Sequence, residues 1–152
     1  MIHEEGAENV RERHCILSEA FINSGQAMGL TCFTHTQLRS DTFAVFDKLA
    51  TLDTSQIVNV PCEKYRTVIA GARNRLNGRV FRFGTMGAFD AETILTELSQ
   101  LESLLIDLGL SMPEGDAFTA ATETFKRQGF AYTWDGLRGE RLETHEAKRS
   151  FN

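Results

Sequence analysis

The chain has 152 residues, 41% of them hydrophobic, and a mean hydropathy of -0.25, which predicts one soluble globular domain. Its net charge of -5 argues against a nucleic-acid-binding surface. It has no run of about 18 apolar residues, so no membrane span is predicted.

Three elements are predicted in the first third of the chain. Residues 7–28 have the periodicity of an amphipathic helix, and His14 on this helix is interpreted as a partly buried histidine with a local partner. Residues 30–35 alternate between apolar and polar side chains and predict a strand. Residues 42–47 alternate in the same way and predict a second strand.

The middle of the chain predicts a short helix, a strand and a loop. Asp53 or Thr54 can cap a helix that Pro61 disturbs or ends, because proline lacks the N–H group and clashes one turn back. Residues 66–70 predict a third strand. Residues 71–78 are rich in Gly, Asn and Arg, and are either a phosphate cradle or a plain connection. They lack the Gly-x-x-x-x-Gly-Lys spacing of a phosphate-binding loop, which favours the connection.

The most informative segment is the strand predicted over 79–83. Alternation places Phe81 and Phe83 on one face and Val80 and Arg82 on the other. An arginine in mid-strand must reach water, a carboxylate or a bound anion, because burying an unpaired guanidinium is costly. Two interpretations stay open here: Arg82 binds the carboxylate of a ligand, or it lies on the solvated face of an edge strand.

Two helices are predicted in the C-terminal half. Leucines recur at helical spacing along residues 90–108, with Asp90 as the N-cap and Gly109 after the last turn. Residues 116–128 predict a last helix whose alanines favour close packing on another helix. The elements together predict an α+β fold. Its small mixed or antiparallel sheet has about three to four strands, with helices packed on one face.

Cysteine and histidine usage bears on metal sites and on location. Cys15, Cys32 and Cys62 are odd in number and form no Cys-x-x-Cys, which favours reduced thiols over disulfides or zinc ligands. The four histidines are scattered without ligand spacing, so no metal site is predicted. The first five residues, Met-Ile-His-Glu-Glu, are acidic where a signal peptide is basic, and we expect a cytoplasmic protein.

Several short motifs, in the right order, carry a resemblance to a known family. Residues 78–87, Gly-Arg-Val-Phe-Arg-Phe-Gly-Thr-Met-Gly, and the helix after them resemble the C-terminal small domain of class V pyridoxal-phosphate-dependent aminotransferases. The subgroup is the alanine–glyoxylate and serine–glyoxylate type. Glu5-Gly6-Ala7-Glu8-Asn9 with Arg13-His14 resembles the start of the long helix that leads into that domain, and residues 65–71 resemble its preceding strand. Thr85 departs from the pattern, because many relatives carry histidine there.

The resemblance assigns Arg82 to the substrate α-carboxylate. Residues 1–129 would be the small-domain-like unit and residues 130–152 a C-terminal extension, in which Phe130, Tyr132 and Trp134 alternate and would cover an apolar face here or on a partner.

The family's large domain, with its cofactor lysine and phosphate-binding residues, has no counterpart in the sequence. None of the four lysines lies in a context that resembles the Schiff-base site. We therefore expect no catalytic residue and no bound cofactor in this chain alone, and pyridoxal phosphate on a partner chain.

Three functions of different classes stay open. The first is a small-domain part of an aminotransferase that transfers an amino group between an amino acid and a glyoxylate- or pyruvate-type oxo acid. It would be inactive without a large-domain partner. The second is a non-catalytic module that keeps the Arg82 pocket for a carboxylate. The third is a purely structural interaction module, with the aromatic stripe at 130–134 as its contact. The possible partners of the chain are a large-domain aminotransferase chain, a second copy of itself, and a small amino or oxo acid.

Overall fold

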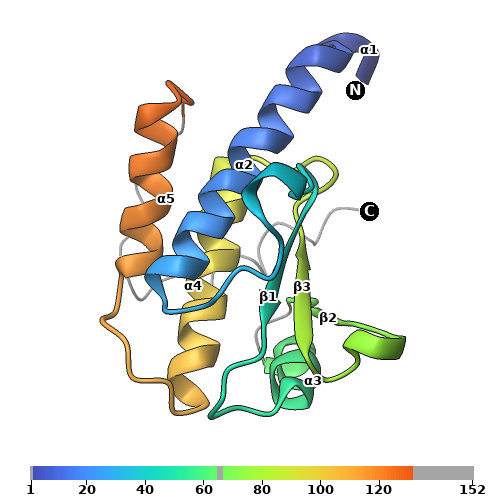
Figure 1. Cartoon of the computed structure of the whole chain (residues 1–152). Coiled ribbons are helices and arrows are strands. Elements are labelled where there is room, and N and C mark those ends of the chain that lie inside the picture. Colours follow the sequence, from blue (N-terminus) through green and yellow to red (C-terminus); the bar gives the residue numbers. More distant parts are fainter. Residues whose placement is uncertain (1, 65–66, 132–152) are drawn as a thin grey trace, which may run out of the picture.

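The computed structural model describes residues 2–64 and 67–131. The helices are α1 (Ile2–Glu5), α2 (Ala7–Ala27), α3 (Thr54–Lys64), α4 (Ala91–Asp107) and α5 (Asp116–Arg127), with single 3-10 turns η1 (Thr36–Leu38) and η2 (Asn74–Leu76). The strands are β1 (Phe43–Asp47), β2 (Ala70–Gly71) and β3 (Val80–Gly84). They form one antiparallel sheet in the order β1-β3-β2. Figure 1 shows the helices against one face of this sheet, so the predicted α+β architecture is confirmed.

Two predicted strands are shorter than expected. Of residues 30–35, only Cys32 forms a bridge, to Phe46 on the outer edge of β1, before the chain bends toward η1. Of the predicted strand 66–70, residue 66 lies outside the described residues, and of residues 67–70 only Ala70 belongs to a strand. Residues 67–69 turn toward α4 instead, where the Thr67 hydroxyl donates to Glu97 at 2.7 Å. Alternation alone therefore overestimated both ladders, because it does not show where a partner strand ends.

Helix α3 continues past Pro61 to Lys64, so the expectation that proline ends the helix there is wrong. A proline in a helix removes one backbone hydrogen bond and does not by itself end the helix when tertiary packing compensates. That packing is present, because Ile57 of α3 is fully buried and Val58 lies close to Gly71 at the sheet.

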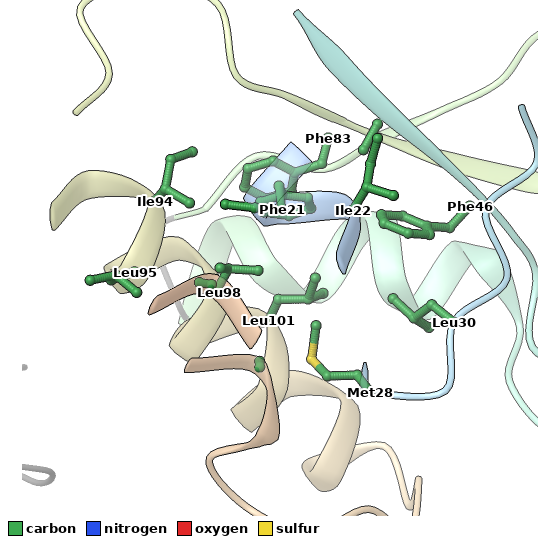
Figure 2. Close-up of a cluster of buried hydrophobic side chains, with 14 of the residues drawn as sticks. Phe21, Ile22, Met28, Leu30, Phe46, Phe83, Ile94, Leu95, Leu98 and Leu101 are labelled. Atoms are coloured by element: carbon green, nitrogen blue, oxygen red, sulfur yellow. The ribbon is translucent and has the colours of Figure 1, made fainter. Parts of the chain in front are cut away.

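Aromatic rings join the sheet to the helices. Phe21 of α2 stacks on Phe83 of β3 with 4.1 Å between ring centroids, and Phe46 of β1 lies 5.7 Å from Phe81. Figure 2 shows Phe21, Phe46 and Phe83 together with aliphatic side chains of α4. The predicted inward face of β3 is therefore the one that carries the two phenylalanines.

Helix α4 has the predicted caps. The Asp90 carboxylate accepts from the Thr93 amide at 2.8 Å, and Gly109 adopts φ +92° just after the helix, where the left-handed region favours glycine. The amide of Leu110 then donates to the carbonyl of Leu105 at 2.9 Å, which closes the C-terminus. The leucine stripe faces inward, with Leu98, Leu101 and Leu105 at most 1% exposed.

Close helix contacts depend on small residues. The Ser24 hydroxyl of α2 donates to the Ala117 carbonyl of α5 at 2.8 Å, and Ala117 and Ala121 are buried between the helices. The next residue of α2 is Gly25, where a Cβ would overlap the Phe46 ring. Phe130 packs against Phe125 at the end of α5, while Tyr132 and Trp134 of the predicted extension lie outside the described residues.

A buried carboxylate that the sequence did not reveal caps α5. Glu102 projects from α4, is 6% exposed, and accepts from the amides of Gly115 at 2.8 Å and Ala117 at 3.4 Å. A carboxylate is stabilised at a helix N-terminus because free amides and the helix dipole both favour negative charge there. No helix within residues 2–64 and 67–131 is apolar and long enough to cross a bilayer.

The α4 stripe makes a quantitative prediction. Leu101→Ala and Leu105→Ala should each lower the free energy of unfolding by about 2–5 kcal/mol, because each removes buried methyl groups and leaves a cavity. Ile106→Ala on the same helix is the control, because Ile106 is 38% exposed and should lose far less. Urea denaturation measures the three values. A loss below about 0.5 kcal/mol at both leucines would place the stripe at the surface.

Candidate functional site

Arg82 lies on the central strand of the sheet, on the face opposite the helices. It pairs with Val45 of β1 and Ala70 of β2, so these three residues share one face. Its side chain is exposed, and Nη2 donates to the Gly71 carbonyl at 2.9 Å. The predicted orientation away from Phe81 is confirmed. Of the alternative interpretation, the edge position is wrong because β3 is the middle strand, whereas the solvated position of Arg82 is observed.

That Arg82 binds the carboxylate of a ligand stays a prediction. The geometry is compatible with it, because most of the guanidinium N–H groups form no hydrogen bond with residues 2–64 or 67–131. No carboxylate in the described part of the chain forms an ion pair with Arg82. One N–H is held by Gly71, which orients the guanidinium, and its other N–H groups are available to a ligand. A planar fork held in this way is suited to a carboxylate.

Arg82 lines an open groove of about 550 Å³, which we call the open-face groove. Its apolar walls come from β1, β3, η2 and the segment after α2: Phe33, Phe43, Val45, Leu76 and Val80. Phe33 and Phe43 are 40% and 44% exposed, which is high for aromatic rings. A second arginine, Arg73, also lines the groove.

The turn that follows β3, residues 84–90, is held by α2. Arg13 donates from Nη1 to the Phe89 carbonyl at 2.7 Å and to the Gly87 carbonyl at 3.2 Å. The Glu5 carboxylate holds the other side of the same guanidinium, at 2.7 Å from Nε and 3.0 Å from Nη2. Arg13 therefore fixes the turn that leaves the Arg82 strand.

His14 makes the second contact with this turn. Its ring is 7% exposed, Nδ1 lies 2.6 Å from the Val10 carbonyl, and Nε2 accepts from the Gly87 amide at 3.1 Å. Since an amide can only donate, Nε2 is the acceptor in this contact, and Nδ1 is the ring nitrogen left to donate to the Val10 carbonyl. The local partner was predicted correctly, but the contact 73 residues away was not.

Two carboxylates beside the turn have lowered pKa values. The hydrogen bond from Arg13 lowers the pKa of Glu5. Partial burial acts to raise the pKa of Asp90, but hydrogen bonds from Thr93 outweigh it and the net shift is downward. Both groups therefore stabilise the fold above their unfolded pKa values of about 4, and this stabilisation is lost as the pH falls through the folded values.

Thr85, where the family resemblance suggested histidine, is fully buried beside this turn. Its amide donates to the Thr42 carbonyl at 2.8 Å, but its hydroxyl has no partner among the described residues. An unpaired buried hydroxyl is destabilising, so Thr85 is not explained by packing alone. The described residues include no group of three or more His, Cys, Asp or Glu side chains that would hold a metal ion.

The His14 contact is testable. His14→Phe cannot accept from the Gly87 amide, and it should lower the free energy of unfolding by about 0.5–1.5 kcal/mol because a part-buried hydrogen bond is lost. Glu12→Ala, at an exposed position on the same helix, is the control and should change the stability by less than about 0.5 kcal/mol. Amide hydrogen exchange should be faster at Gly87 in His14→Phe only. Unchanged exchange there would contradict the assigned contact.

Known aminotransferases resemble this chain in sequence. No protein-family model matches the chain. The chain is 29% identical over 131 residues to a serine–glyoxylate aminotransferase of Methylorubrum extorquens, an alignment covering 86% of this chain and 33% of the relative. It is 32% identical over 114 residues to an uncharacterized aminotransferase of Methanocaldococcus jannaschii, covering 75% of this chain and 30% of the relative. The chain thus spans about a third of the length of these curated relatives.

A solved structure gives the same match. The ureidoglycine–glyoxylate aminotransferase of Bacillus subtilis superimposes with a TM-score of 0.77 and 26% identity, over 82% of this chain and 33% of that one. In both comparisons the region matched is the C-terminal part of a larger aminotransferase. Sequence and fold together show that this chain corresponds to the C-terminal small domain of the class V aminotransferases.

Proposed function

We propose that this chain is the small-domain part of a pyridoxal-phosphate-dependent aminotransferase of the glyoxylate type, which is inactive without a large domain. Its role is to hold the carboxylate of the amino acid or oxo acid at Arg82. The large domain lies on a partner chain, or on the same polypeptide if these residues are part of a longer one. The free thiols of Cys15 and Cys32 fit a reducing compartment, so the proposal places the protein in the cytoplasm.

One observation carries the proposal: Arg82 stands in the middle of the open sheet face of a chain whose relatives are aminotransferases. The open-face groove leaves its free N–H groups accessible. The Arg82 guanidinium is fixed by the hydrogen bond from Nη2 to the Gly71 carbonyl. It can hold a carboxylate through two parallel hydrogen bonds and so orient the substrate before the reaction begins. The clamp of Arg13 and His14 on the following turn keeps the end of that strand in place.

Lys48 and Lys126 do not fit a cofactor site. Pyridoxal phosphate supplies an electron sink for amino transfer once a lysine amine holds it. Lys48 follows β1 and Lys126 lies in the last turn of α5, and neither lines the open-face groove. No step of the reaction is therefore assigned to the cofactor on this chain. The exposed rings of Phe33 and Phe43 support a covering partner at the groove.

The first prediction from this proposal concerns the cofactor. Borohydride reduction of the natively purified protein should leave a pyridoxyl adduct on a lysine of a large-domain segment, and none on residues 1–152. The isolated chain mixed with pyridoxal phosphate is the control and should show no stoichiometric adduct. Peptide mass spectrometry locates the adduct. A stoichiometric lysine adduct within residues 1–152 would contradict the proposal that the large domain holds the cofactor.

The second prediction concerns Arg82. In the complete enzyme, Arg82→Lys should lower kcat/KM for amino acids by ~10-fold or more, about 1.4 kcal/mol of transition-state binding, because lysine cannot form the two parallel hydrogen bonds. Arg79→Lys is the matched control, since Arg79 is exposed just before the same strand and does not line the groove. The melting temperature should hardly change in either variant. A lower melting temperature with unchanged kinetics would make Arg82 a structural residue.

A further inference from the structure

The open-face groove contains two guanidinium groups and not one. Arg82 comes from β3, and Arg73 comes from the connection between β2 and β3. Arg73 is exposed, has extended backbone at the start of η2, and its carbonyl accepts from the Leu76 amide at 3.3 Å. Within the part of the chain that the structure describes, its side chain has no hydrogen bond or ion pair. This second cation has no role in the proposed function.

The surroundings of the two arginines favour an anion. No acidic side chain lines the groove, and Asp47, the acidic residue opposite Val80 in the sheet, lies outside its lining. Residues 71–84 contain four arginines and no acidic residue, whereas the whole chain has a net charge of -5. The positive charge is therefore concentrated at this hairpin. The rest of the groove lining is largely apolar, and Phe33 and Phe43 are its exposed rings.

We propose that the open-face groove selects small dicarboxylates, meaning an acidic amino acid or the corresponding oxo acid. This inference rests on the proposed function, because Arg82 takes the carboxylate next to the reacting carbon. Arg73 takes the second carboxylate, and the methylene groups between the two carboxylates lie against the apolar lining of the groove. The groove, at about 550 Å³, is within the usual size of small-molecule sites and has room for such an acid.

Charge pairing gives the second arginine its selective effect. A ligand with a carboxylate at one end and a neutral group at the other would satisfy Arg82 but leave Arg73 with water alone. A dicarboxylate would satisfy both, with charge-assisted hydrogen bonds at each end. Discrimination between the two ligands therefore depends on Arg73, while the binding that they share depends on Arg82.

The test titrates the full chain with succinate and with succinamate, which has the same length but a neutral amide in place of one carboxylate. Arginine Nε–Hε signals in proton–nitrogen correlation spectra report the binding. The Kd of succinate should be ~10-fold or more lower than that of succinamate, because succinate has one additional carboxylate to pair with Arg73. Arg73→Leu should reduce succinate binding to the succinamate level and leave succinamate binding unchanged. Arg73→Lys should retain part of the preference, because it keeps the charge.

Two further variants separate this inference from the proposed function. Arg82→Leu should weaken both ligands, and Arg75→Leu, an exposed arginine of the same connection outside the groove lining, should weaken neither. Equal affinities for the two ligands, or no effect of Arg73→Leu, would overturn the dicarboxylate inference while Arg82-dependent binding left the proposed function intact. Binding that is insensitive to Arg82→Leu would contradict both. Tighter binding of inorganic phosphate than of succinate, or no succinate binding, would also overturn the inference.

Discussion

Phe83 of β3 stacks on Phe21 of α2, and Phe81 lies against Phe46 on the same side of the sheet. Because successive residues of a strand point to opposite faces, these two buried rings fix the direction of the residue between them. A shift of one residue in the β3 register would bury Arg82 and expose both phenylalanines. Such a shift would remove two large apolar side chains from the core and place an unpaired charge there. The position of the candidate ligand group is therefore enforced by hydrophobic packing.

Small residues likewise determine how closely the helices pack. Gly25 allows α2 to approach the Phe46 ring, and Ala117 and Ser24 allow α5 to approach α2. The middle and the C-terminal part of α2 thus pack in the core, while its N-terminal part contacts the turn after β3. Its first turns carry Arg13 and His14, which hold the 84–90 turn, so a helix that builds the core also positions the end of the strand that bears Arg82. Core packing and site geometry are coupled through this one helix.

Local patterns predicted what local physics determines. The leucine stripe with its caps gave α4 correctly, and alternation gave the two faces of β3 and the side on which Arg82 lies. Predictions failed where a distant partner decides the outcome. The bridge of Cys32 and the brief pairing of Ala70 depend on where the neighbouring strands end. The contacts of His14 with Gly87 and of Glu102 with Gly115 join residues from separate elements, and no spacing in the sequence indicates them.

The hairpin of β2, η2 and β3 carries four positive charges on a chain that is negative as a whole. This separation makes the molecule an electric dipole with its positive end at the open-face groove. An anion that approaches this hairpin would be drawn toward the groove before it touches the protein. Such steering acts over about a Debye length, roughly 8 Å at physiological ionic strength, and salt weakens it. The rate at which anionic ligands reach Arg82 would therefore fall with ionic strength even where their final contacts are unchanged.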